Sequence, residues 1–157
     1  MNDQQQLEKL MALRQQRVQQ AERALLEQQR NCRHSAEQLY MLEQRLSDHL
    51  HAVDEHEQHW FDAAGGSLTG PELEDIRQAI DDHQRETASL DHQQREQGQQ
   101  HQAHQEEREQ RATEWAGKVR AHRALEELSR RHDRKRQSRQ ELYAELELED
   151  ATPRGGH

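Results

Sequence analysis

Residues 62–71 read Asp-Ala-Ala-Gly-Gly-Ser-Leu-Thr-Gly-Pro and interrupt two long stretches of helix-forming sequence. Glycine and proline break helices, so this cluster predicts a turn. Pro71 suits the first turn of a helix, where its missing N–H costs nothing, and Glu72 favours the positive helix end. We expect one hairpin over residues 1–150, with a helix at about 3–61, a turn at 62–70, a helix at about 71–148 and a disordered tail at 151–157.

The composition indicates long helices and not a globular core. Only 30% of the 157 residues are hydrophobic, 34% are charged and five are aromatic. So little apolar material leaves either disorder or a thin seam between long helices. Seven glycines and two prolines are too few for a typical disordered chain, and the abundant Gln, Glu, Arg, Leu and Ala all favour helix.

The first stretch carries a heptad seam, in which apolar residues recur every 3.5 residues as in coiled coils. Eleven of its sixteen positions are apolar. The sixteen positions are Leu7, Met11, Arg14, Val18, Ala21, Leu25, Gln28, Cys32, Ser35, Leu39, Leu42, Leu46, His49, Val53, His56 and Trp60. Trp60 with Phe61, like Trp115 in the second stretch, suits either a seam anchor or an exposed binding hot spot.

The second stretch carries a matching but interrupted seam. Its members are Leu73, Ile76, Ile80, His83, Thr87 and Leu90, then Ala112, Trp115, Val119 and His122, then Leu125 and Leu128 after a slip of three residues. Between 91 and 111 the only apolar residue is Ala103. This polar gap predicts weak packing in the middle of the second helix.

Folding the chain at Gly66 places residue i opposite about residue 132 − i. Trp60 then faces Leu73, Leu42 faces Leu90, Val18 faces Trp115 and Leu7 faces Leu125, while the polar stretch faces Gln28 and Cys32. The two seams strengthen and weaken together, which favours an all-α, antiparallel coiled-coil hairpin.

The same register leaves residues beyond about 130 without a partner in the first helix. Six basic residues lie there: Arg130, Arg131, Arg134, Lys135, Arg136 and Arg139. An unsupported helix of this length is marginal in water, so we expect this overhang to order against a partner.

Other features narrow the function classes. The net charge of −9 argues against nucleic acid as a partner, and no stretch is apolar enough to span a membrane. The start lacks the basic and apolar regions of a signal peptide, and the single cysteine, Cys32, fits a reducing compartment. These features favour the cytoplasm.

Catalysis and metal binding find little support in the sequence. Two histidine pairs have i, i+3 spacing, His56 with His59 and His101 with His104, but metal sites need three or four ligands. No phosphate loop, cysteine pair or nucleophile elbow occurs, and a two-helix hairpin offers no enclosed site. We expect no catalytic residues, no metal and no cofactor.

Three segments resemble the FliJ/YscO family, the stalk proteins of flagellar and virulence type III secretion systems. The segments are Cys-Arg-His-Ser-Ala-Glu-Gln-Leu-Tyr-Met-Leu at 32–42, Ile-Arg-Gln-Ala-Ile-Asp-Asp-His at 76–83, and Trp115 followed by Lys118, Arg120, Leu125, Glu126 and Leu128. Their order and spacing, with the chain length and the central turn, carry the resemblance.

The resemblance implies a non-catalytic coupling protein in the bacterial cytoplasm, peripheral at the base of the secretion apparatus. It implies an export-gate set, Gln38, Leu42, Ile76, Ala79 and His83, that binds the cytoplasmic ring of the gate. It also implies that the end with both termini enters the hexameric ATPase, so we assign an ATPase set: Leu7, Met11, Trp115, Val119, Leu125, Leu128, Arg130, Arg131 and Arg134. Secretion chaperones are further expected partners, without assigned residues.

Arg45, His49 and Glu72 fall where flagellar relatives carry aromatic residues, which favours the virulence branch. Two other functions share the same physical features. One is an unrelated coiled-coil adaptor or scaffold, and the other is a metal- or pH-responsive helical bundle that uses the twelve histidines.

Overall fold

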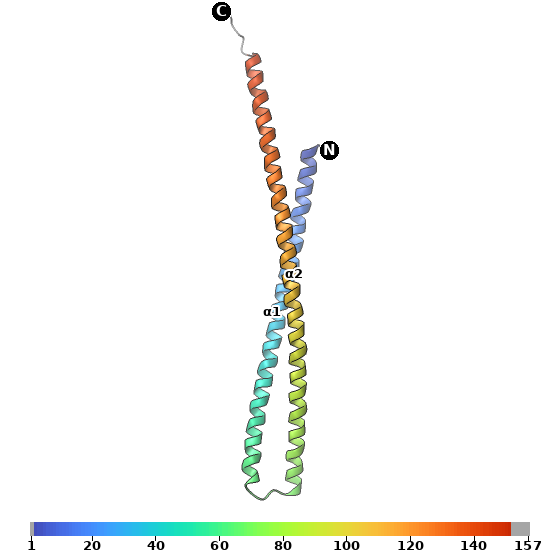
Figure 1. Ribbon diagram of the computed structural model, residues 1–157, viewed down its shortest axis with the longest axis vertical. Helices are drawn as coiled ribbons and strands as arrows, with labels where there is room; N and C mark the ends of the chain where they lie inside the picture. Colours follow the sequence, from blue (N-terminus) through green and yellow to red (C-terminus); the bar gives the residue numbers. More distant parts are fainter. Residues whose placement is uncertain (1, 152–157) are drawn as a thin grey trace, which may run out of the picture. The chain divides into compact units, whose positions relative to one another are not determined.

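The computed structural model describes residues 2–151, which form two long α-helices joined by a short turn (Figure 1). Helix α1 spans Asp3–Ala64 and α2 spans Gly70–Ala151, and the described residues contain no strand. The helices pack against each other as an antiparallel pair, so the predicted all-α hairpin is confirmed. Both helices extend beyond the expected bounds, with Ala151 closing α2. Residues 152–157 of the expected tail lie outside the described residues.

The helix ends are fixed by local hydrogen bonds. Thr69 Oγ1 accepts from the Glu72 backbone N–H at 3.3 Å, while a Glu72 carboxylate oxygen accepts from the Thr69 N–H at 3.2 Å. This reciprocal pair is a capping box, and it starts α2 at the expected place. At the start of α1, Asn2 Oδ1 accepts from the Gln5 N–H at 2.9 Å. Each cap satisfies backbone donors that a helix end leaves without intrahelical partners.

The chain divides into two compact units. Unit 1 comprises Met1–Leu25 and Arg111–His157, and unit 2 comprises Leu26–Gln110, which includes the turn. Three side chains of the described residues are buried, namely Cys32 at 4%, Leu90 at 3% and Ser35 at 3% exposure, and all three belong to unit 2. Unit 2 therefore holds the tightest helix packing.

The seam predicted for the first helix lies between the helices. Of its sixteen positions, only His56 is exposed, and the other fifteen are half-buried or buried. The second seam is confirmed less completely, because Leu73 is 53% exposed, Ile80 39% and Leu128 56%. After Leu125 the half-buried stripe runs through Ser129 and His132.

In unit 2 the register is displaced by about one helical turn from the predicted one. Gln97 Nε2 donates to Gln38 Oε1 at 3.1 Å, and His101 Nδ1 lies 3.2 Å from Ser35 Oγ, so residue i faces about 136 − i. One cause is the later turn, since α1 continues to Ala64.

The expected contact of Trp60 with Leu73 is also wrong, because the Trp60 ring lies beside His83 and Leu73 is exposed. Side chains on a helix lean towards its N-terminus. Because the Trp60 side chain leans away from the loop, its indole contacts α2 about one turn further from the loop than the residue that lies opposite the Trp60 backbone.

The polar stretch of α2, residues 91–111, packs against α1 although Ala103 is its only apolar residue. Ser35 and Cys32 are the most buried positions of α1, and they lie where the sequence predicted the weakest contact. Their small side chains let the helices approach closely, and His101 meets Ser35 with a polar contact. Paired polar groups and small side chains thus replace leucines here.

Leu90 offers a direct test of this packing. Because Leu90 is 3% exposed, Leu90→Ala should lower the free energy of unfolding by about 2–3 kcal/mol, near the low end for buried leucines. The same change at Leu50, which is 45% exposed, should lower it by less than about 1 kcal/mol. Urea unfolding followed by circular dichroism measures both, and equal losses would contradict the observed seam.

Candidate functional site

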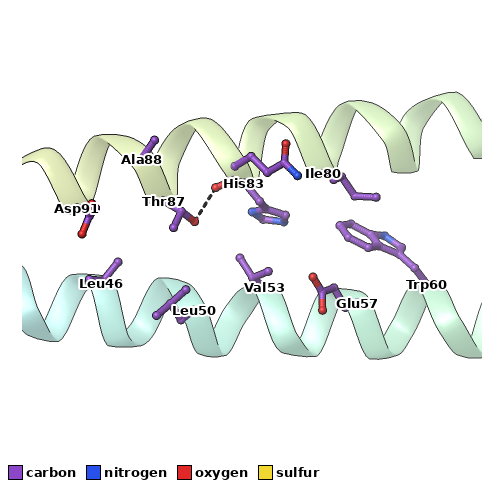
Figure 2. Close-up of a pocket in the computed structure, with 11 residues that line it drawn as sticks. Leu46, Leu50, Val53, Glu57, Trp60, Ile80, His83, Thr87, Ala88 and Asp91 are labelled. Atoms are coloured by element: carbon purple, nitrogen blue, oxygen red, sulfur yellow. Dashed lines mark hydrogen bonds between the residues drawn. The ribbon is translucent and has the colours of Figure 1, made fainter.

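A groove with a volume of about 490 Å³ lies between α1 and α2 in unit 2 (Figure 2). Its walls come from about four turns of α1 and about three turns of α2. The lining residues are Leu46, Leu50, Val53, Glu57 and Trp60 of α1 and Ile80, His83, Gln84, Thr87, Ala88 and Asp91 of α2. Most of this surface is apolar, with carboxylates at Glu57 and Asp91.

Aromatic rings form one end of the groove. The indole of Trp60 extends across it towards His83 and Ile80 (Figure 2). The Trp60 and His83 ring centroids are 5.8 Å apart, and His56 lies 5.9 Å from Trp60 and 5.0 Å from His83. These separations are typical of interacting aromatic pairs, so the three rings support one another.

A chain of hydrogen bonds links the histidines of the two helices. His56 Nδ1 and His83 Nε2 are 2.9 Å apart, so one nitrogen donates and the other accepts. His49 Nε2 lies 2.9 Å from Thr87 Oγ1 and 3.3 Å from the His83 carbonyl oxygen. Since a carbonyl oxygen only accepts, these contacts require a proton on His49 Nε2.

The contact between His49 and Thr87 does not form a nucleophile–base pair. The Thr87 hydroxyl donates its hydrogen to the His83 carbonyl oxygen at 2.8 Å, as the dashed line in Figure 2 shows. His49 Nε2 donates to this hydroxyl, so it does not accept the hydroxyl proton. The arrangement orients side chains and gives the hydroxyl no activating base.

One histidine of each pair singled out in the sequence contacts a residue of the other helix. His56 contacts His83 of the other helix, and His101 contacts Ser35, whereas the sequence paired them with His59 and His104. Within residues 2–151 no group of three or more His, Cys, Asp or Glu side chains is arranged to hold a metal ion. His49, His56 and His83 hydrogen-bond and lie ring against ring beside the groove.

All five residues of the export-gate set belong to unit 2. Leu42, Ile76 and Ala79 are half-buried between the helices, and only His83 lines the groove. Gln38 is exposed, and its amide nitrogen lies 3.1 Å from His34 Nε2 while its oxygen accepts from Gln97. Most residues of the export-gate set therefore lie between the helices, and Gln38 is the exposed member.

All nine residues of the ATPase set belong to unit 1. Five of them are half-buried between the helices: Leu7, Met11, Trp115, Val119 and Leu125. Leu128, Arg130, Arg131 and Arg134 are exposed. Arg130 and Arg131 pair with Glu126 and Glu127 one turn earlier, at 3.3–3.8 Å.

The overhang of α2 begins a few residues later than the expected position of about 130. His132 is still half-buried, and Arg136 Nη1 donates a hydrogen bond to Gln4 Oε1 at the start of α1. The long arginine side chain leans towards the N-terminus of α2 and so reaches back to α1. Residues 133–151 are all exposed, which makes this segment the true overhang.

Comparison with protein-family models, with curated proteins and with solved structures finds no significant match. Over residues 2–151 neither helix contains a segment long and apolar enough to cross a lipid bilayer.

The sequence analysis missed the groove as a site. One feature of the sequence could have indicated the groove, namely an apolar residue directly beside the seam. This residue is Leu50, which follows seam position His49 and lies one turn after Leu46. An apolar residue at such a flanking position widens the stripe beyond a two-stranded seam. The histidine cluster left no comparable signal, since it depends on the register between the helices.

The Thr87 hydroxyl tests the hydrogen-bonded chain. Thr87→Val keeps the shape but removes the contacts to His49 and to the His83 carbonyl, so we expect a loss of about 1 kcal/mol in the free energy of unfolding. Thr87→Ser keeps the hydroxyl and should lose clearly less. If both variants unfold at the same urea concentration, the hydroxyl contributes nothing and the assignment fails.

Proposed function

We propose that this chain is a non-catalytic stalk or coupling protein of a type III protein secretion system. In this role it links the hexameric secretion ATPase to the cytoplasmic ring of the export gate and also serves secretion chaperones. It acts in the bacterial cytoplasm, peripherally at the base of the apparatus. The proposal is supported by the family resemblance and by the positions of the ATPase set and the export-gate set on the same two helices.

One observation carries the proposal furthest. The ATPase set lies entirely in unit 1 and the export-gate set entirely in unit 2, while α1 and α2 run through both units without a break. The two helices therefore connect the residues proposed for the ATPase with those proposed for the export gate. This is what a protein that couples two machines requires.

The basic segment 130–139 of α2 supports the ATPase part of the proposal. Arg130, Arg131 and Arg134 project into solvent from unit 1, and residues 133–151 continue as an exposed helix. Exposed arginines carry long-range attraction for acidic surfaces and set the rate of encounter. A ring whose lumen carries acidic side chains fits this segment.

Charge reversal tests this part. Arg130→Glu, Arg131→Glu and Arg134→Glu together should weaken binding to the purified secretion ATPase on the order of tenfold at low salt, and the residual binding should depend less on salt. The matched control is Arg23→Glu, Arg33→Glu and Arg45→Glu, which changes as many exposed charges on α1. The control should bind almost as the unmodified chain does.

Stability is the second readout for both triple variants. Arg130 and Arg131 are exposed and their partners Glu126 and Glu127 are half-buried, and ion pairs at the surface contribute only a few tenths of a kcal/mol each. The melting temperatures should therefore change little. Equal ATPase binding by both triple variants and the unmodified chain would refute the ATPase contact and leave a coiled-coil adaptor outside secretion as the better function.

A further inference from the structure

The negative charge of the chain is concentrated around the groove. From Leu46 to Asp91, the outermost lining residues, the sequence holds twelve Asp or Glu and two Arg, a net charge of −10 with histidines neutral. The whole chain carries −9, so the remainder is close to neutral. The groove therefore lies within an acidic region.

Little positive charge offsets this region. Its two arginines, Arg77 and Arg85, pair with Glu74 and Asp82 of the same helix at 3.9 and 3.8 Å. Asp91 pairs with Arg95 at 3.1 Å, but Glu57 has no ion pair or hydrogen bond to any described residue. An unpaired carboxylate on the groove wall favours a cationic group in its occupant.

The apolar part of the groove is wider than a two-helix seam requires. Leu50 is 45% exposed and Ile80 is 39% exposed, and both border the groove beside Trp60. Helices in bundles of three or more carry a broad apolar stripe, whereas a strict two-stranded seam is narrow. The flanking leucine and isoleucine thus indicate a third helix.

We propose that this groove binds a basic amphipathic α-helix of a partner protein. The apolar stripe of that helix packs on Leu50, Trp60 and Ile80, and its flanking Lys or Arg residues face Glu57 and the surrounding carboxylates. From Leu46 to Trp60 the groove follows fifteen residues of α1, about 21 Å, which matches a partner helix of about four turns. Of the export-gate set only His83 belongs to this surface, so the proposal does not rest on the secretion function.

The C-terminal part of a second copy of this chain fits the groove poorly. Its basic segment, 130–139, contains no apolar residue to fill the groove. Leu142, Tyr143 and Leu146, which follow that segment, alternate with glutamates that the acidic region would repel. Neither stretch combines positive charge with an apolar stripe.

A synthetic peptide of eighteen residues tests the proposal, with leucines on one helical face and lysines beside them. In a Trp115→Phe background, Trp60 is the only tryptophan, so its emission reports on the groove. We expect a saturable blue shift with the lysine peptide and at least tenfold weaker binding of the same peptide with glutamates for lysines. Binding of both peptides with equal affinity, or of neither, would overturn the proposal.

Variants locate the binding. Leu50→Glu should weaken binding of the lysine peptide at least tenfold, and Glu57→Lys should move the preference towards the glutamate peptide. Met41→Glu is the matched control, because Met41 is 64% exposed on α1 outside the groove, and it should bind as the parent does. Circular dichroism verifies that each variant keeps its helices.

Two results would refute this assignment. Equal weakening by Leu50→Glu and Met41→Glu would show that the peptide binds elsewhere or without specificity. A dimer in sedimentation that Leu50→Glu dissociates would assign the groove to a second copy of the chain.

Discussion

The contact between α1 and α2 along one narrow stripe holds this structure together. Each helix is long, at 62 and 82 residues, yet only Cys32, Ser35 and Leu90 are buried among the described residues. Isolated helices gain little from the propensity of their residues, and packing of one face supplies most of their stability. The capping box at Thr69 and the small residues of α1 act through this contact, since they fix where α2 begins and how closely the helices approach.

The helices, the turn and the seam of α1 could be predicted from the sequence, because hydrophobic periodicity and helix breakers report them directly. The register and the polar stretch could not. Hydrophobic patterns count leucines, whereas the contacts at Ser35 and His101, and at Gln38 and Gln97, depend on small side chains and paired polar groups. The sequence also could not reveal a displacement of the register by one turn, because the second seam is interrupted between Leu90 and Ala112.

The candidate site, too, could be predicted from the sequence only in part. Trp60 and His83 were recognised as seam residues, but their contact depends on the way a side chain leans along its helix and on the register. The groove results from Leu50 and Ile80 lying beside the seam, where they widen the apolar surface in the most acidic part of the chain. Unit 1 carries a basic segment at 130–139, so this part of its surface suits a partner of a different charge from the one that the groove favours.

Disulfide trapping tests the antiparallel pairing most directly. In a Cys32→Ser background, we compare Ser35→Cys with His101→Cys against Ser35→Cys with Gln97→Cys, which follows the register predicted from the sequence. Two cysteines cross-link readily only when their Cα atoms lie within about 7 Å. The structure predicts a rapid bond within one chain for the first pair and a slow bond for the second. Faster trapping of the second pair, or products linked between two chains, would contradict the hairpin described here.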